Sequence, residues 1–366
     1  MNHESKSVRR PWRRVVAVLA GVGLSVPLLT TAPVSAAEEP ATEAPQAQYL
    51  LSVPGGELDS VDNAVSASGG MVVARYDVAS SILVQMPRNA PVPAGAVVVP
   101  DLSMEFQGTD DAGDLPTNTH RETSAVPDDV DGSGVTVALI DTGVADTGEL
   151  NVEHVNVSGG AAGDGLGHGT FLAGLIAGSG AASSGDFAGS APGAKILDVQ
   201  VAEADGSTSL SKVLAGLQAV SDRAATDPSL KVANLALSTG SPLPPWFDPL
   251  TRGLDKLWYQ GVTVVVASGN DGKGEVSSPA SDPLLLAVGS VDENDTGKRS
   301  DDRVADFSAY DRTFGSIRPD VVAPGVSLVS LRAPGSIADA ENPSARVQDK
   351  YFKGTGTSMS AALTSG

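Results

Sequence analysis

The pattern of apolar and polar residues changes near Gly132. Beyond it, short continuous apolar runs such as VTVALI, VANLAL and VTVVVA alternate with segments of helical periodicity. Continuous runs are typical of strands buried on both faces. One periodic segment places five apolar residues on a single helical face: Leu210, Val213, Leu214, Leu217 and Val220. Residues 132–366 are therefore predicted to form an α/β domain, with a mostly parallel central sheet and helices on both faces.

A smaller pattern precedes this domain. Residues 48–106 contain the strand-like runs QYLLSV, MVVARYDV and SILVQM, with a helical pattern at Leu58, Val61 and Val65 between the first two. We expect a small α+β module, whose length of roughly 60 residues is marginal for independent stability. Residues 107–131 are polar and acidic, which predicts a linker and a domain boundary.

The first 36 residues have the layout of a secretory signal peptide. A basic stretch, SKSVRRPWRR, is followed by an apolar run that ends in small residues, with a cleavage site expected after Ala36. Pro27 interrupts the run, which disfavours a permanent membrane span, and no later stretch could span a bilayer. Residues 37–47 are predicted to be a linker rich in Pro, Ala and Glu. We expect a secreted, extracellular protein.

Composition narrows the function classes. The 24 Lys and Arg residues against 44 Asp and Glu give a formal net charge of -20, which argues against nucleic acid and anionic membranes as partners. The chain contains no cysteine, which excludes disulfides, thiolate metal sites and a cysteine nucleophile.

A strand-like run ends in Asp141, Thr142 and Gly143. The aspartate is either a turn-capping residue or a catalytic group. The Asp-Thr-Gly loop of aspartic proteases requires a second loop that supplies a partner carboxylate. The tripeptide recurs at Asp146 and Asp295, but no apolar strand leads into either copy, and this interpretation is disfavoured.

Three further polar residues stand at an expected strand end or helix start. His168 lies between two glycines before an apolar helical segment, which suits a neutral general base. Asn270 follows a buried strand and is either a turn residue or a donor to an oxyanion. Ser358, in GTGTSMSAAL, is either a helix N-cap or a nucleophile beside free N–H groups.

The order Asp141, His168, Ser358 is that of subtilisin, in contrast to chymotrypsin and the α/β-hydrolases. The segments DTG, GHGT, SGN and GTSMS resemble the aspartate, histidine, oxyanion and serine motifs of the subtilisin-like serine peptidases, and RPDVVAPG resembles another family segment. The resemblance covers residues 132–366. It implies a secreted serine endopeptidase acting on polypeptides, with these three residues as the triad and Asn270 in the oxyanion hole. It also implies that the substrate-binding residues are Ser238, Thr239, Gly240, Ala267, Ser268 and Gly269.

Further expectations follow from the resemblance. Residues 48–106 are similar to an inhibitory propeptide, an intramolecular partner cut off near residues 107–131. No cofactor is required and no metal ligand is assigned. Structural calcium is compatible with the family, but acidic loops such as Asp292–Asp302 show no ligand spacing.

Two departures from the family pattern stand at Phe171 and at Ser360–Leu363, where we expect altered packing and intact chemistry. Family members continue past this point, so the domain is expected to be C-terminally truncated, with weak or no activity as given. A catalytically silent secreted binding protein with the same fold is the alternative to an enzyme, and an aspartic protease is a remote one.

Overall fold

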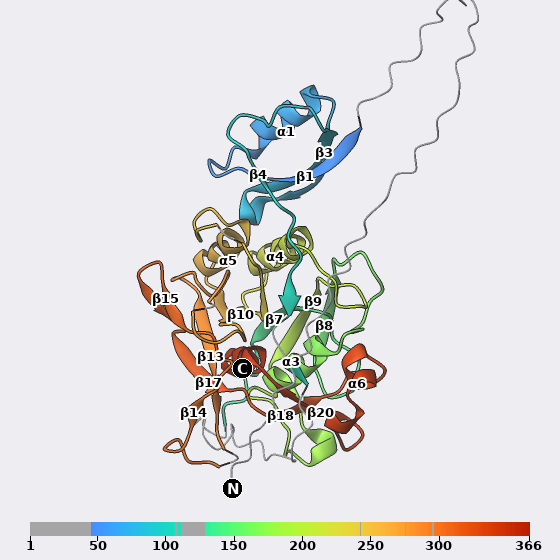
Figure 1. Cartoon of the computed structure of the whole chain (residues 1–366). Helices are drawn as coiled ribbons and strands as arrows, with labels where there is room; N and C mark the ends of the chain where they lie inside the picture. The colour runs from blue at the N-terminus through green and yellow to red at the C-terminus, as the bar shows by residue number, and fades with distance from the viewer. Residues whose placement is uncertain (1–44, 107–108, 111–128, 242, 275, 295) are drawn as a thin grey trace, which may run out of the picture. The chain divides into compact units, whose positions relative to one another are not determined.

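The computed structural model describes residues 45–106, 109–110 and 129–366, apart from residues 242, 275 and 295 (Figure 1). The predicted signal peptide and most of both predicted linkers lie outside the described residues. Within these ranges, no helix is both long and apolar enough to cross a membrane.

A mostly parallel sheet forms the centre of the C-terminal domain, residues 132–366. The described residues place its eight strands in the order β14-β13-β12-β10-β7-β9-β8, with β17 also paired to β13. Only the β13–β14 pair is antiparallel among these. The strands are β7 (Thr136–Asp141), β8 (Val152–Asn156), β9 (Lys195–Gln200), β10 (Leu230–Leu235), β12 (Thr263–Ala267), β13 (Leu286–Asp292), β14 (Arg303–Val304) and β17 (Val321–Pro324). The predicted parallel sheet is confirmed.

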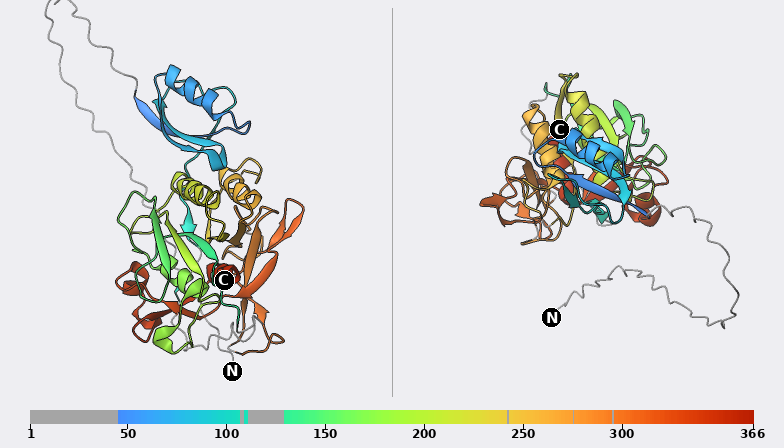
Figure 2. Two further views of the ribbon diagram at one scale, coloured as in Figure 1. Left: turned by 180° about the vertical axis from the view of Figure 1, so that it is seen from behind. Right: turned by 90° about the horizontal axis from the view of Figure 1, so that it is seen from above.

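Helices cover both faces of this sheet, as predicted (Figures 1 and 2). Strand β7 shows the division, because its side chains alternate between two apolar cores. Ala138 and Ile140 pack with α4 (Leu210–Ala224) and α5 (Pro249–Tyr259). Val137 and Leu139 pack with α3 (His168–Ala177) and α7 (Thr357–Ser365). The helices that carry the candidate histidine and serine therefore share one face.

Helix α5 begins and ends at residues suited to those positions. The Asp248 side chain caps the helix by accepting from the Leu250 N–H at 3.0 Å, and Pro249 takes the first helical position. Beyond the other end, Gly261 adopts a φ of 87°, which a glycine tolerates without strain.

Smaller elements surround the sheet. A second sheet has the order β18-β20-β19, and β6 also pairs with β20. Its strands are β18 (Leu328–Leu331), β19 (Arg346–Val347), β20 (Tyr351–Thr355) and β6 (Thr109–Asp110). The remaining elements are β11 (Leu237–Ser238), β15 (Asp311–Thr313), β16 (Ser316–Arg318), α6 (Ile337–Glu341) and the short helices η2 (Ala181–Ser183) and η3 (Pro343–Ala345).

The N-terminal module, residues 45–106, is the α+β unit that the sequence predicts. Its antiparallel sheet has the order β2-β3-β1-β4. The elements are β1 (Gln46–Ser52), α1 (Leu58–Ala67), β2 (Met71–Tyr76), η1 (Asp77–Ala79), β3 (Ser81–Pro87), β4 (Val97–Val99) and a final strand β5 (Glu105–Phe106). Strand β1 begins inside the expected 37–47 linker.

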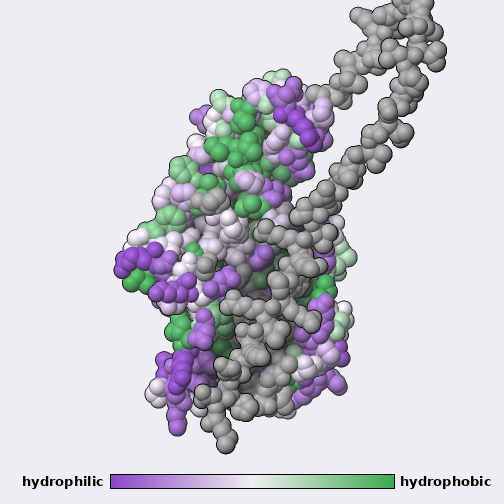
Figure 3. Space-filling view, in the orientation of Figure 1, coloured by the Kyte–Doolittle hydropathy of each residue, from purple (hydrophilic) through white to green (hydrophobic). Residues whose placement is uncertain are grey.

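The module sheet packs on both faces. Leu51, Ile82 and Val84 join the core beneath α1, whereas Leu50 and Leu83 join the core that contains α4 and α5. Apolar side chains nonetheless gather on the module surface (Figure 3), where Met71 and Val97 are exposed. A module of roughly 60 residues is marginally stable alone, so its packing against the core with α4 and α5 adds stability.

Candidate active site

The four candidate residues stand at the ends of elements in the C-terminal domain. Asp141 is the last residue of β7, and Asn270 follows β12. His168 is the first residue of α3, and Ser358 lies in the first turn of α7. In α/β sheets, functional groups gather beyond the carboxyl ends of parallel strands. From this rule we expect the four residues, which are far apart in sequence, to lie close together.

Asp141 and His168 form a buried pair. The Nδ1 atom of His168 lies 2.8 Å from Oδ1 of Asp141, whose side chain is fully buried. The same carboxylate oxygen accepts from the Thr142 N–H at 2.8 Å. A carboxylate at Nδ1 fixes the ring orientation and favours the tautomer in which Nε2 is the basic nitrogen.

Ser358 is fully buried at the start of α7. Its Oγ makes no hydrogen bond with any described residue, so a Ser358–His168 bond is not formed in this state. Such bonds are often open before substrate binds. The Ser358 N–H lies in the first helical turn, where backbone N–H groups have no intrahelical acceptor. Helices α3 and α7 meet beside it, since the side chains of Phe171 and Met359 both border Gly354.

Asn270 is tied to the turn that carries the serine. Its Oδ1 accepts from the Thr357 N–H at 3.0 Å and from the Thr357 hydroxyl at 2.9 Å. The Gly269 N–H donates to the same hydroxyl at 3.3 Å. Because Oδ1 is engaged, the orientation of the side-chain amide is fixed. Its Nδ2 group donates to none of the residues that the structure describes, which leaves a positioned donor beside Ser358.

Asp164 is a buried residue that sequence reasoning missed. Its carboxylate accepts from the Gly167 and Thr170 N–H groups, each at 2.7 Å, and from the hydroxyls of Thr170 at 2.6 Å and Thr142 at 2.8 Å. Burial raises the pKa of Asp164, opposed by these hydrogen bonds. It joins the Asp141 loop to the start of α3. The available signal was an aspartate shortly before a predicted helix start.

A second histidine–carboxylate pair lies nearby. Nδ1 of His154 is 2.8 Å from Oδ2 of Asp198, which also accepts from the Val144 N–H at 3.1 Å. Burial raises the pKa of Asp198 to about 6, although the histidine opposes the shift. Since Val144 follows the Asp141 loop directly, this pair supports the backbone of that loop.

An extended segment of the N-terminal module lies along the predicted substrate-binding strand. Strand β5 pairs antiparallel with β11, with Phe106 opposite Leu237 and Glu105 opposite Ser238. The Phe106 ring lies 5.4 Å from the imidazole of His168, measured between centroids. The module therefore reaches Ser238, whose role in substrate binding stays a prediction.

The other predicted substrate-binding residues differ in burial and in hydrogen bonding. Thr239 forms a bridge with Ser278, and with Gly240 it lines a cavity beside β11. Ala267 is buried in the core with α3 and α7. Ser268 is also buried, and its Oγ has no partner among the described residues. Gly269 is the member of this set whose backbone N–H donates to the Thr357 hydroxyl, next to Ser358.

Beyond the two residues that follow Phe106, the chain pairs with β20, the strand that leads to the serine. Thr109 of β6 lies opposite Thr355 of β20, three residues before Ser358. The stretch from Phe106 to Thr109 therefore connects a strand beside His168 to a strand beside the serine turn.

The two departures from the family pattern are accommodated by packing. Phe171 is buried in the core beneath the sheet. The Ser360 hydroxyl donates to the carbonyls of Ala323 at 3.0 Å and Pro324 at 3.1 Å. Neither residue replaces a member of the candidate triad.

The described part of the chain contains no group of three or more His, Asp or Glu side chains placed to hold a metal ion. In the acidic loop considered for calcium, the Thr296 hydroxyl donates to Asp301 at 3.0 Å. The calcium expectation stays untested.

The aspartic-protease alternative needs a carboxylate opposite Asp141. Oδ1 of Asp141 instead contacts a histidine. Of the two further Asp-Thr-Gly copies, Asp146 is exposed in a turn closed by the Gly148 N–H at 3.2 Å, and Asp295 lies outside the described residues.

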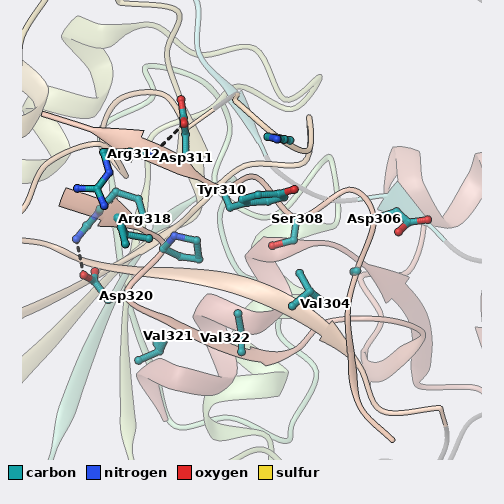
Figure 4. A pocket seen from close by; sticks show the side chains of 14 residues that line it. Val304, Asp306, Ser308, Tyr310, Asp311, Arg312, Arg318, Asp320, Val321 and Val322 are labelled. Carbon is teal, nitrogen blue, oxygen red and sulfur yellow. Dashed lines mark hydrogen bonds and ion pairs between the residues drawn. The ribbon is translucent and has the colours of Figure 1, made fainter. Parts of the chain in front are cut away.

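A larger cavity, of about 830 Å³, lies among β14, β15, β16 and β17 (Figure 4). Tyr310, Arg312, Val321 and Val322 line it, and Arg318 at its wall pairs with Asp320 at 2.6 Å. It contains none of the candidate site residues.

Comparisons with known proteins agree with this geometry. Residues 132–366 match a family model described as the subtilase family. The serine protease AprX of Bacillus subtilis is 36% identical over 254 residues, which cover 64% of this chain and 56% of that protein. Subtilisin Savinase of Lederbergia lenta is 38% identical over 213 residues, covering 56% of this chain and 68% of that protein.

The crystal structure of fervidolysin from Fervidobacterium pennivorans superposes with a TM-score of 0.65 at 22% identity, covering 90% of this chain and 55% of that one. At that identity the likeness shows the fold. The chain spans little more than half the length of AprX and of fervidolysin. With the family model covering residues 132–366, the chain belongs to the subtilase family.

Proposed function

We propose that the protein is a secreted serine endopeptidase that hydrolyses peptide bonds through an acyl-enzyme intermediate. The observation that carries this proposal is the buried Asp141–His168 pair at 2.8 Å, on the same face of the sheet as a buried serine at a helix start. The relatives named serine protease AprX and subtilisin Savinase support it.

In the proposed mechanism, Ser358 Oγ attacks the substrate carbonyl while Nε2 of His168 accepts the hydroxyl proton. The same nitrogen then donates that proton to the leaving amine, and the carbonyl carbon stays bonded to Oγ as an ester. Water then hydrolyses the ester: His168 takes a proton from the water and returns one to Ser358 Oγ as the carboxylic acid product leaves. Asp141 keeps the imidazole oriented and stabilises its cation without taking the proton.

The negative charge that develops on the carbonyl oxygen requires donors. Asn270 Nδ2 and the Ser358 N–H are assigned to this role. The amide is held by its two contacts with Thr357, so the donor is positioned before substrate arrives. A preorganised donor lowers the barrier because it does not reorganise during the reaction.

The N-terminal module is proposed to be an inhibitory propeptide and the first substrate. Its strand β5 pairs with β11, the strand expected to bind substrate, and β6 pairs with β20, which leads to Ser358. The scissile bond is therefore expected between Phe106 and Thr109. Within the linker of residues 107–131, the cleavage site is therefore proposed to lie at the N-terminal end.

Export and cofactor use remain sequence-based proposals. The signal-peptide layout of residues 1–36 favours an extracellular location. The proposed mechanism uses protein side chains and water, and calcium would be structural.

The proposal is tested by incubating the secreted protein with casein, with and without a serine-directed inhibitor, while the mature N-terminus is sequenced. We expect inhibitor-sensitive hydrolysis and a new N-terminus at residue 107, 108 or 109. The open Ser358 geometry is the one observation that favours a catalytically silent binding protein. That alternative predicts no hydrolysis and no self-processing.

A further inference from the structure

We propose that Asp198 is a positioning residue for the reaction: its carboxylate holds the turn that follows Asp141, and His154 at the surface helps to keep that carboxylate ionised. This inference rests on the proposed peptidase function and assigns roles to two further residues near the same site. Neither residue belongs to a segment that resembles a family motif. The rate of hydrolysis should therefore respond to the charge of a carboxylate outside the proposed triad.

The turn that follows Asp141 is anchored through two of its backbone N–H groups. The Val144 N–H donates to Oδ2 of Asp198 at 3.1 Å, and Asp198 lies in β9. The Ala145 N–H donates to the Thr170 hydroxyl at 2.9 Å, and Thr170 lies in α3. One contact therefore ties the turn to the sheet, and the other ties it to the helix that begins with the candidate histidine.

Close packing leaves this turn little room to shift by itself. A Cβ atom placed on Gly143 would lie 2.6 Å from the Gly163 carbonyl oxygen, and one placed on Gly169 would lie 2.2 Å from the Gly143 carbonyl oxygen. Gly169 directly follows His168 at the start of α3. Because packed interiors transmit strain, a displacement at Val144 is passed to the backbone on both sides. Small displacements of reacting groups lower the rate steeply.

Asp198 is a buried carboxylate with few partners. Its side chain is 3% exposed, and its Oδ1 has no hydrogen-bond partner among the described residues. Burial raises the pKa of Asp198 to about 6 and Asp164 adds to the shift, whereas His154 opposes it. Hydrogen bonds to an ionised oxygen are stronger than those to a neutral one. The Val144 N–H is therefore held less firmly once Asp198 takes up a proton.

His154 connects this buried carboxylate to solvent. It lies on β8, the last strand at this edge of the sheet, directly opposite Asp198 in the parallel pairing. Its Nδ1 is 2.8 Å from Oδ2 of Asp198, while 48% of its side chain is exposed. The pair therefore joins a group that solvent can protonate to the acceptor of the Val144 N–H.

The elements around Asp198 contribute few other titratable groups. Asp164, in the loop before α3, acts on Asp198 together with His154. On β7, Asp141 lies two positions further along the same face, and α3 has no titratable side chain apart from His168. Of the two groups that act on Asp198, only His154 can carry a positive charge. Loss of His154 should therefore make Asp198 harder to ionise.

The test compares kcat/KM of the full-length wild type and Asp198→Asn on a peptide anilide across the pH range. An asparagine oxygen is a neutral acceptor at every pH, as is that of a protonated aspartate. The ratio of wild type to variant should approach one at about pH 5 and rise to about fivefold at about pH 8. Its midpoint should lie near the Asp198 pKa of about 6. Titration of His168 occurs in both proteins and largely cancels in the ratio.

His154→Gln tests the second half of the inference. Glutamine retains a donor but carries no charge, so the pKa of Asp198 should rise. The midpoint of the ratio, now measured between His154→Gln and the double variant with Asp198→Asn, should move to higher pH. In the Asp198→Asn background, His154→Gln should have no effect, because the two residues act as one unit. Asp186→Asn, which removes an exposed carboxylate, is the matched control and should give a ratio near one at every pH.

The outcomes separate this inference from the proposed function. A wild-type to Asp198→Asn ratio that is constant with pH, or a midpoint that His154→Gln does not move, would overturn the inference, while Ser358-dependent hydrolysis sustained the proposed function. If thermal unfolding shows that Asp198→Asn does not fold, His154→Gln should still lose activity relative to the wild type as the pH falls from about 8 to 6. Parallel pH profiles would then overturn the inference. A wild type that hydrolyses no peptide would refute both.

Discussion

The two ends of the Asn270 side chain have separate roles. Oδ1 holds Thr357, and Nδ2 is the proposed donor to the oxyanion. We predict that Asn270→Leu lowers kcat by about 10² to 10³, the magnitude found for the equivalent change in subtilisin, a member of the same family. Steady-state kinetics on a peptide anilide measure the loss.

Asn270→Asp is the control that separates donation from positioning. A carboxylate still accepts from both Thr357 donors but offers no N–H to the substrate. The Asp variant should lose a comparable factor in kcat while unfolding at the wild-type temperature. Unchanged turnover in both variants would remove Asn270 from the oxyanion role.

Asp164 is predicted to stabilise the histidine end of the site. In Asp164→Asn, the amide nitrogen cannot accept from the donors that the carboxylate now serves. We expect a loss of about 2–3 kcal/mol in unfolding free energy, measured by urea denaturation. Asp146→Asn, at an exposed turn with one weak backbone contact, should change it by less than about 0.5 kcal/mol. Equal stabilities of the Asp164 variant and the wild type would contradict this role.

The sequence identified some of these residues and not others for a physical reason. Asp141, Asn270 and Ser358 interrupt apolar runs or follow glycine-rich turns, so each stands out in the linear pattern. Asp164 does not, because one of its donors, Thr142, is brought to it only by the tertiary fold. Asp198 interrupts the apolar run of β9, but nothing in the linear pattern connects it to His154, which lies in β8.

At the scale of an element, helix α5 carries a poorly solvated carboxylate. Burial, then repulsion from Asp282, raises the pKa of Asp255 to about 7, and Arg252 offsets part of this shift. Oδ1 of Asp255 is buried and has no partner among the described residues. We predict that Asp255→Asn stabilises the protein by about 1–2 kcal/mol above pH 7, a value reduced for the partial solvent access of the group.

The sign follows from proton binding. The folded state keeps the Asp255 proton up to about pH 7, whereas the unfolded chain loses it near pH 4. Wild-type stability contributed by this group therefore falls as pH rises from about 4 to 7. The advantage of the Asn variant should grow over that window and disappear below it, as followed by thermal unfolding. Asp222→Asn on the exposed surface of α4 is the control, and a pH-independent difference for the Asp255 variant would contradict the assignment.

Strands with a continuous apolar run could be predicted from the sequence, whereas strands at the edge of a sheet could not. Strands β7, β10 and β12 are nearly continuous apolar runs, because helices cover them on both faces. Strand β8 lies at the sheet edge, and its residues are only partly buried or exposed. It therefore has no continuous apolar run to reveal it. The hairpin β15–β16 is likewise polar and largely exposed.

At the scale of the whole molecule, the N-terminal module docks through a carboxylate as well as apolar contacts. Asp101 accepts from the Ser211 N–H at 2.8 Å and from its hydroxyl at 2.7 Å, at the start of α4. Negative charge is favourable at a helix N-terminus. We predict that Asp101→Ala weakens inhibition by the added residue 45–106 fragment about tenfold.

The control for this prediction is Glu57→Ala, which removes an exposed carboxylate whose side chain makes no capping bond to α1. Inhibition constants should be unchanged by it. An Asp101 variant that inhibits as tightly as the wild-type fragment would show that docking depends on the apolar contacts alone.

The identity of the nucleophile is tested most directly by labelling with a fluorophosphonate probe, followed by intact-mass and peptide mass spectrometry. The wild-type protein should take up one probe, on Ser358, after its N-terminal module is removed, and Ser358→Ala should take up none. His168→Ala should label far more slowly, because the serine then lacks its base. Labelling at another residue, or equal labelling of Ser358→Ala, would contradict a catalytic Ser358.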